Sequence, residues 1–246
     1  MLGIIGGSGL TQLSNLQVTH REVVRTPYGE PSGALTFGRL NDQEVVFIAR
    51  HGYGHTIPPH AVNYRANIWA LHSQKVERVV SVASVGGIRS DMKPGAIAVP
   101  MQVIDYTYGR KQTFFDGIDQ PVTHADFTHP YCGKLRAALL GAGKSASLPV
   151  IDGGVYAATQ GPRLESAAEI NRLERDGADM VGMTGMPEAA LAREMGLRYA
   201  TVAVVANWAA GRGDSADEVH LDVIRAVLTE AMGKVRVLLE TLVRAG

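Results

Sequence analysis

The sequence predicts an α/β sandwich built around a mostly parallel or mixed β-sheet. Short β-branched apolar runs alternate with longer segments of helical composition, which is the pattern of strands joined by crossover helices. Clusters of glycine and polar residues follow several of these runs. Because ligands in such sheets bind at the carboxyl ends of strands, we expect a site where these clusters meet.

The elements follow one another in a regular order. Six apolar runs are expected to be strands: Gly3 to Ile5, Val45 to Ala49, Arg78 to Ser84, Ala96 to Val99, Asp179 to Met183 and Arg198 to Ala206. Several are apolar throughout, as in strands buried on both faces. Helices are expected over Asn63 to Ser73, Tyr131 to Leu140, Glu165 to Arg175, Pro187 to Met195, and from about Ala216 to the end.

The polar stretch from Asp105 to Tyr131 interrupts this alternation. It carries Phe and Tyr side chains, and we expect it to leave the sheet and reach a neighbouring subunit. His124 or Phe127 of that stretch is then a candidate contact to the neighbour's site. No linker, repeat or low-complexity tract divides the 246 residues, so a single domain over residues 1–246 is expected.

Composition narrows the class of partner. Twenty-four basic and 24 acidic residues give a net charge of zero, which argues against nucleic acid and against an anionic membrane surface. A small molecule fits better. Cys132 is the one cysteine, so no intramolecular disulfide forms, and the first residues lack the basic region of a signal peptide. We expect a cytoplasmic protein without a membrane span.

The segment from Gly3 to Gly9, GIIGGSG, places a glycine loop directly after a predicted strand. Its backbone amides and the Ser8 hydroxyl could cradle an anion. The spacing matches neither the dinucleotide fingerprint nor a nucleotide P-loop. A tight turn that needs glycine is the alternative interpretation.

A second cluster follows the strand that ends at Ala49. Arg50, His51, His55 and His60 lie within eleven positions. Arginine offers a planar fork of donors suited to phosphate, and a neighbouring histidine adds a donor. A histidine metal site is the alternative, but no acidic ligand is interspersed, so we expect an anion site and no metal.

Two further strand ends carry candidate ligand contacts. The run VVSVAS breaks into two glycines after Ser84, where exposed amides could face a ligand. The segment GMTGMPE provides the Thr184 hydroxyl as a donor. Met183 before it could line a sugar face, although a buried methionine is more often part of a core.

Five segments in order resemble one known family. They are MLGIIGGSGL, TPYGEPSGAL, FIARHGYGHTIPPHAVNYRANIWAL, GMTGMPEAALAREMGL and YATVAVVAN, and they cover nearly the whole chain. Together they resemble methylthioadenosine phosphorylases and trimeric purine nucleoside phosphorylases. The resemblance implies a nucleoside phosphorylase-like, three-layer α/β sandwich with a central mixed sheet. It also implies homotrimers, or dimers of trimers, with shared active sites.

The resemblance also implies roles for particular residues. Phosphate is expected on Ser8, Arg50, His51, the Ser84 backbone and Thr184, with Met183 under the ribose. Inorganic phosphate is then a co-substrate, and no metal or organic cofactor is expected. One position departs from the family, because Ala83 stands where methylthioadenosine phosphorylases carry a threonine.

Two positions bear on the base. Glu165 in GPRLE matches the glutamate that trimeric purine nucleoside phosphorylases direct at the base, and Asn207 matches the asparagine of 6-oxopurine enzymes. Hypoxanthine offers an N1–H donor to an ionised Glu165 and an O6 acceptor to the Asn207 amide, whereas adenine reverses both. Each residue alone could instead be a helix-terminal charge or a turn cap. Together they favour a 6-oxopurine.

The position that faces the 5′ group differs from that of purine nucleoside phosphorylases. Those enzymes resemble one another in a histidine that bonds the 5′-hydroxyl, and that position falls on Leu221 here. Leucine cannot pair with a hydroxyl but can pack a methylthio group. A one-residue shift would place His220 there instead, and Leu221 would then be an ordinary core residue.

These observations favour phosphorolysis of 5′-methylthioinosine, with Asn207, Glu165 and His51 as the catalytic residues. Phosphate would attack C1′ while hydrogen bonds stabilise the leaving purine. Four alternatives stay open. They are an inosine/guanosine phosphorylase, an adenine-specific methylthioadenosine phosphorylase, a hydrolytic nucleosidase, and a nucleoside-binding regulatory subunit without catalysis.

Overall fold

Strand β5 (Arg78–Gly87) is the centre of the sheet in the computed structural model, which describes residues 1–117 and 121–245. It pairs in parallel with β1 (Leu2–Gly6) and β11 (Arg198–Trp208), and antiparallel with β10 (Met180–Gly182). The other strands are β2 (Gln17–Glu22), β3 (Leu35–Leu40), β4 (Gln43–Ala49), β6 (Ile97–Val99), β7 (Gln102–Asp105), β8 (Val150–Asp152) and β9 (Val155–Ala158). In the described residues this mixed sheet has eleven strands, in the order β2-β3-β4-β1-β5-β10-β9-β7, with β11 on β5, β6 on β11 and β8 on β6.

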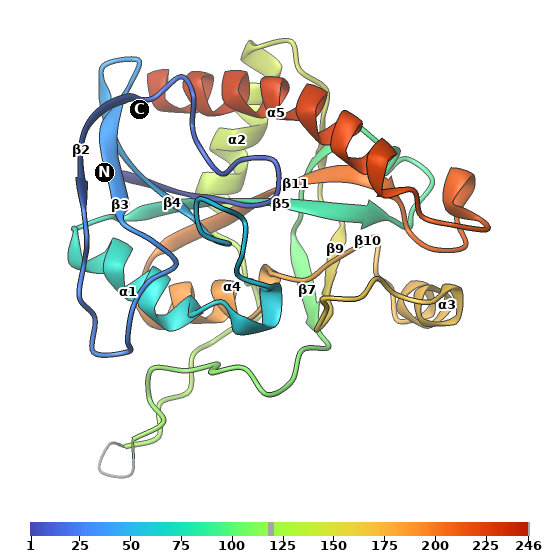
Figure 1. Ribbon diagram of the computed structural model, residues 1–246, viewed down its shortest axis with the longest axis horizontal. Helices are drawn as coiled ribbons and strands as arrows, with labels where there is room; N and C mark the ends of the chain where they lie inside the picture. The colour runs from blue at the N-terminus through green and yellow to red at the C-terminus, as the bar shows by residue number, and fades with distance from the viewer. Residues whose placement is uncertain (118–120, 246) are drawn as a thin grey trace.

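Side chains of β5 alternate between two cores, because successive residues of a strand point to opposite faces. Val79 and Val85 pack with helices α1 (Tyr64–Ser73) and α4 (Gly185–Glu194). Val80 and Val82 pack with α2 (Gly133–Ser145) and α5 (Leu221–Arg244) on the other face. Figure 1 shows these two helical layers on either side of the sheet, which confirms the predicted three-layer sandwich with a mixed sheet.

The remaining helix, α3 (Ala167–Arg175), covers one end of the sheet. Its buried residues Ile170 and Leu173 pack with Ala157 of β9 and Val181 of β10. No helix within the described ranges combines the length and the hydrophobicity needed to cross a membrane.

Several predicted boundaries were wrong. The strand expected to end at Ser84 continues to Gly87, because Gly86 and Gly87 still pair with β10 and β11. The helix expected from about Ala216 begins at Leu221, after a loop and a short 3₁₀ turn. Glu165 was expected inside a helix but precedes α3, whose N-terminus is a capping box between Ser166 and Glu169.

The predicted excursion begins after β7 and extends from the body of the molecule (Figure 1). Both of its ends fold back onto their own chain. The Phe114 ring packs against Tyr28 with ring centroids 4.9 Å apart, its backbone N–H donates to Glu194, and Phe127 packs against the core. Residues 118–120 of the segment, and residue 246 of the last helical prediction, lie outside the described residues. Contact with a neighbouring subunit stays a prediction.

Candidate active site

A cavity of about 610 Å³ lies where the ends of β1, β4, β5, β10 and β11 meet. All nine residues proposed from the sequence as ligand contacts line it: Ser8, Arg50, His51, Ser84, Glu165, Met183, Thr184, Asn207 and Leu221. The structure therefore brings together residues that are separated by as many as 213 positions in the chain.

The mixed topology explains this convergence. β1, β4, β5 and β11 are parallel, so their carboxyl ends reach the same edge of the sheet. β10 runs antiparallel to β5, with Val181 opposite Gly86, so the chain beyond it returns along β5. This turn of direction brings Met183 and Thr184 to the same cavity as Ser84.

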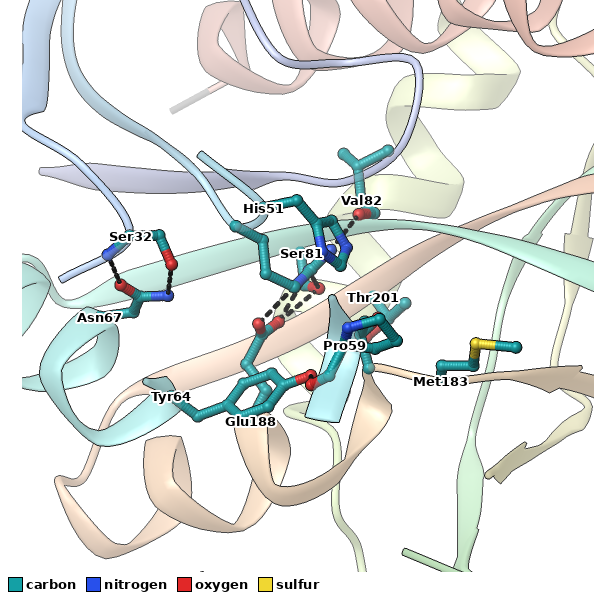
Figure 2. A network of polar contacts seen from close by, with 12 residues as sticks. Ser32, His51, Pro59, Tyr64, Asn67, Ser81, Val82, Met183, Glu188 and Thr201 are labelled. Atoms are coloured by element: carbon teal, nitrogen blue, oxygen red, sulfur yellow. Dashed lines mark hydrogen bonds and ion pairs between the residues drawn. The ribbon is translucent and has the colours of Figure 1, made fainter. Parts of the chain in front are cut away.

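The most buried charged residue that lines the cavity is Arg50, which is 1% exposed. Its guanidinium donates to both carboxylate oxygens of Glu188, over 2.6 Å from Nε and 2.9 Å from Nη2. It also donates to Ser81 Oγ and to the Val82 carbonyl. Glu188 is itself fully buried and accepts further hydrogen bonds from the hydroxyls of Ser81 and Tyr199. Figure 2 shows several of the dashed contacts meeting at the Glu188 carboxylate, with Ser81 beside it.

This pairing limits what Arg50 can offer to an anion. Among the described residues its contacts use four of its five N–H groups and leave one on Nη1. The sequence predicted a two-pronged fork on phosphate, but here the fork holds Glu188 instead. Burial alone would lower the pKa of Arg50, and the Glu188 carboxylate reverses that effect and raises it. The pair is thus charged, and together it is neutral.

His51 is buried beside this pair and its tautomer follows from one contact. Nδ1 lies 2.8 Å from the Ile57 carbonyl, which can only accept, so Nδ1 carries the proton. Burial, and next the charge of Arg50, lower the pKa of His51 to about 4. At neutral pH the ring is uncharged and Nε2 is an acceptor. The sequence predicted that His51 donates a hydrogen bond to the ligand, but its N–H already donates to the Ile57 carbonyl.

The glycine loop after β1 brings Ser8 to the cavity. Gly7 has a steric reason to be glycine, because a Cβ there would lie 2.5 Å from the Val82 carbonyl and 2.8 Å from Arg50 Nη1. The loop therefore lies directly against the guanidinium. This close approach explains the motif without an anion, and it also places the Ser8 hydroxyl in the cavity.

Ser84, Met183 and Thr184 also line the cavity. Thr184 is the N-cap residue of α4, yet its hydroxyl makes no capping hydrogen bond. The Thr184 side chain interacts instead with the buried Tyr156 hydroxyl. Ala83, the position that departs from the resembled family, is buried in the core and is not among the residues that line the cavity.

Glu165 and Asn207 are two further polar residues that line the cavity. Thr159 Oγ1 donates to Glu165 Oε1 over 2.6 Å, which leaves Oε2 for another donor. The register of β11 against β5 shifts between Val205 and Asn207, a β-bulge that re-aims the strand's last side chains. Asn207 Nδ2 donates to the Trp208 carbonyl, so its second N–H and Oδ1 remain.

Part of the lining is apolar. It includes Val219, Leu221, Ile224 and Leu228, from the loop before α5 and the first turns of that helix. Leu221 is the first residue of α5 and is 60% exposed, so it is not a core leucine. His220 is the exposed N-cap residue and does not line the cavity. The structure therefore places the leucine there and not its neighbour.

The other histidines of interest lie at the rim or outside the cavity. His55 lines the cavity with its ring 4.9 Å from the His51 ring, whereas His60 and His124 are exposed and do not line it. Within residues 1–117 and 121–245, no group of three His, Cys, Asp or Glu side chains could hold a metal ion.

Sequence reasoning missed several residues in or near the cavity. Glu188 is an isolated acid within the apolar stretch of α4, and an unpaired acid on a buried helix face would have signalled a partner. Ile57, Pro58 and Pro59 form a wall of the cavity, but no local pattern distinguishes them from any proline loop. Arg110 was missed because all its contacts are distant in sequence.

Comparisons with known proteins identify the family to which this chain belongs. Residues 1–244 match the family described as the phosphorylase superfamily. A relative in Xanthomonas campestris pv. campestris, named a probable S-methyl-5′-thioinosine phosphorylase, is 50% identical over 94% of this chain and 93% of its own. The 6-oxopurine nucleoside phosphorylase of Pyrococcus furiosus is 48% identical over 85% of this chain and 80% of its own. The structure of methylthioadenosine phosphorylase from Schistosoma mansoni with adenine superimposes with a TM-score of 0.95 at 32% identity, over 99% of this chain and 91% of that one.

Proposed function

The chain belongs to the phosphorylase superfamily, and from this premise we propose that it phosphorolyses S-methyl-5′-thioinosine to hypoxanthine and 5-methylthioribose 1-phosphate. One observation carries the proposal. A single cavity is lined by a carboxylate and an amide, those of Glu165 and Asn207, and also by apolar side chains that include Leu221. The printed name of the Xanthomonas relative supports the same substrate.

The base end matches a 6-oxopurine. Glu165 Oε2 accepts from the N1–H of hypoxanthine, and the free N–H of Asn207 donates to O6. Adenine presents an acceptor at N1 and a donor at the 6-position, so both contacts would be mismatched. Mismatched polar groups in a hydrogen-bonding site cost about 10⁴–10⁵ in selectivity.

The sugar end matches a methylthio substituent. Burial of an apolar group is favourable by roughly 0.8 kcal/mol per CH₂ equivalent, whereas an unpaired hydroxyl in the same place is unfavourable. Met183 also lines the cavity and provides an apolar surface for the ribose.

Phosphate binds at the inner end, on the hydroxyls of Ser8 and Thr184, the Ser84 backbone and the remaining N–H of Arg50. Neutral His51 accepts the O–H of a hydrogen phosphate through Nε2. Because Arg50 is already balanced by Glu188, the bound phosphate keeps its negative charge. That charge faces the ribosyl group and stabilises the cation that develops at C1′.

In the reaction a phosphate oxygen bonds to C1′ while the C1′–N9 bond breaks and its electron pair stays with the purine. The Asn207 N–H stabilises negative charge on O6, and Oδ1 accepts from N7–H once N7 is protonated. The proton that phosphate loses balances the one that the purine gains. No step requires a metal or an organic cofactor, so dialysis against EDTA should leave the rate unchanged.

We also propose a homotrimer, or a dimer of trimers, in the cytoplasm. Exposure of Leu221 at the mouth of the cavity supports this assembly, because a neighbouring subunit would cover it. Analytical ultracentrifugation gives the assembly directly, and a monomer at working concentration would contradict it.

The test is phosphate-dependent release of base from S-methyl-5′-thioinosine, inosine and methylthioadenosine, with a control that lacks phosphate. The proposal expects the highest kcat/KM for S-methyl-5′-thioinosine. Preference for methylthioadenosine would contradict the roles of Glu165 and Asn207. Release without phosphate would indicate a hydrolase, and binding without turnover a regulatory subunit.

A second candidate is a general 6-oxopurine nucleoside phosphorylase. The open sugar end leaves space around Leu221, and the Pyrococcus relative carries that name. Equal or higher kcat/KM for inosine would favour it. The base-recognition proposal would be unaffected.

A further inference from the structure

The guanidinium of Arg110 contacts three chain segments next to the cavity. It donates from Nη1 to the carbonyls of Met183 and Met186, over 2.8 and 2.6 Å. From Nη2 it donates to the Thr159 and Gln160 carbonyls, over 3.3 and 2.9 Å. Arg110 does not itself line the cavity.

A third segment is reached through Tyr64. Arg110 Nη1 lies 3.3 Å from the Tyr64 hydroxyl, which donates in turn to the Pro59 carbonyl over 2.8 Å. Figure 2 shows Tyr64 bonded to Pro59, with Met183 on the far side of Pro59. Pro59 and Met183 both line the cavity, so one side chain is connected to two of its walls.

The path of the chain explains how Arg110 reaches this place. β7 pairs in parallel with β9, and the backbone stays beside it as Tyr106 N–H donates to the Ala158 carbonyl and Tyr108 N–H to the Gln160 side chain. Two residues further on, Arg110 lies beneath the loop that follows β9. The start of the excursion is therefore fastened to its own subunit.

Arginine suits this arrangement better than lysine does. Among the described residues its acceptors are all neutral oxygens, and all three guanidinium nitrogens donate to them. Lysine presents one compact charge with three donors on a single nitrogen and cannot span them. Four of the acceptors are main-chain carbonyls, so the contact fixes mainly backbone.

The segments held by Arg110 carry residues with separate roles. Met183 and Thr184 belong to the sugar and phosphate end, and the loop from Thr159 leads to Glu165 at the base end. We propose that Arg110 is a positioning residue. It fixes two loops, residues 183–186 and residues 159–165, relative to each other. The proposal rests on the proposed function, because it assigns that reaction's geometry to a residue outside the cavity.

The test compares Arg110→Lys and Arg110→Ala with the matched control Arg136→Ala. Arg136 is also half-buried and donates to two backbone carbonyls, those of Val99 and Pro100, but it lies away from the cavity. A displacement of about 1 Å can cost about 10²-fold in rate, so we expect kcat/KM for the nucleoside to fall by about that factor in Arg110→Ala and at least about tenfold in Arg110→Lys. Arg136→Ala should retain the wild-type value.

Two readouts separate positioning from mere loss of stability. Millimolar guanidinium, far below the molar range that unfolds proteins, should restore part of the rate of Arg110→Ala and none in the control. Hydrogen exchange should speed up in peptides that cover residues 159–165 and 183–186 of both Arg110 variants. This expectation does not depend on a change in the thermal midpoint of unfolding. The exchange measurement needs no substrate.

The outcomes are distinct. Wild-type kcat/KM in Arg110→Lys, or a rate loss without faster exchange in either loop, would overturn the positioning role. If Arg110→Ala does not fold, the lysine variant decides alone. Failure of the wild-type protein to cleave any purine nucleoside would overturn the proposed function. Faster exchange confined to the two loops of the Arg110 variants would still show that Arg110 holds these loops in place.

Discussion

Two regions of the site differ in how many of their contacts are already made within the chain. At the inner end, where phosphate is proposed to bind, Arg50 and Glu188 are 1% and 0% exposed and are bonded to each other and to their surroundings. At the outer end, where the 5′ group is proposed to bind, Leu221 is 60% exposed and stands on the first turn of α5. The contacts of the inner end are made by folding, whereas folding leaves Leu221 exposed.

This difference separates two kinds of contribution to function. A buried ion pair removed from water is costly to break, so residues of the inner end should influence stability and activity together. Exposed apolar residues contribute little to folding, so those at the outer end should influence selectivity alone. Four experiments examine this division, from the largest expected effect to the smallest.

The largest effect is expected for Glu188→Gln. It leaves Arg50 buried with an uncompensated charge, and breaking such a pair destabilises a protein by about 3–5 kcal/mol. Urea unfolding measures the loss. Glu230→Gln is the matched control, because its exposed pair with Lys234 contributes about 0.3–0.5 kcal/mol. Equal losses for both variants would mean that the inner end is not preassembled.

The second experiment uses the low pKa of His51, about 4 against 6.5 when unperturbed. Between these pH values the unfolded chain binds a proton that the folded protein excludes, so the free energy of unfolding falls as pH drops from 6.5 to 4. Burial supports an effect of up to about 3 kcal/mol. The loss is complete below pH 4 and absent above pH 6.5.

Chemical unfolding of wild type, His51→Gln and His60→Gln at several pH values measures this contribution. The slope between pH 6.5 and 4 should be shallower in His51→Gln than in wild type. His60 is exposed and outside the cavity, so His60→Gln should keep the wild-type slope. Identical slopes in all three proteins would contradict a neutral, buried His51.

The third change, Asn207→Asp, acts at the base end, where half-buried groups face the cavity. The aspartate cannot donate to O6, so kcat/KM for a 6-oxopurine nucleoside should fall about 10–100-fold, in line with the loss of one transition-state hydrogen bond. Asn171→Asp, an exposed position whose side chain only accepts from Arg212, should behave as wild type. An unchanged rate in Asn207→Asp would overturn its role in base recognition.

The smallest effect is expected at the outer end, for Leu221→His. Selectivity should shift from the methylthio substituent towards the 5′-hydroxyl by about threefold to thirtyfold, the size of one or two methylene equivalents in a pocket. Thermal stability should change little. Val223→His is the control, since Val223 is 54% exposed on the same helical turn but does not line the cavity. If both variants shift selectivity equally, Leu221 does not contact the 5′ group.

Much of the architecture could be predicted from the sequence because its strongest signals are local. The apolar runs that became β1, β4, β5 and β11 are recognisable by composition. The prediction missed β2, β3, β7, β8 and β9. β2 has the sequence QVTHRE, which is exposed throughout and offers no hydrophobic pattern to read.

The site divides in the same way. Residues that follow apolar strands, such as Arg50 and Asn207, could be proposed because strand ends converge in this fold. Their hydrogen-bond partners could not be proposed from the sequence. The partner of Arg50, Glu188, lies 138 positions away, and the N–H of His51 donates to the Ile57 carbonyl only once the loop has folded. Local sequence indicates which groups are present, and tertiary structure decides which of their donors remain free.

The bulge at the end of β11 has a consequence for how this protein could diversify. The register skips Ala206, while Asn207 and Trp208 stay paired with Gly86 and Gly87 of β5. A substitution of the side chain at position 207 therefore leaves the backbone pairing of the strand in place. Under the proposed role of Asn207, base preference can change at this position while the scaffold is inherited intact.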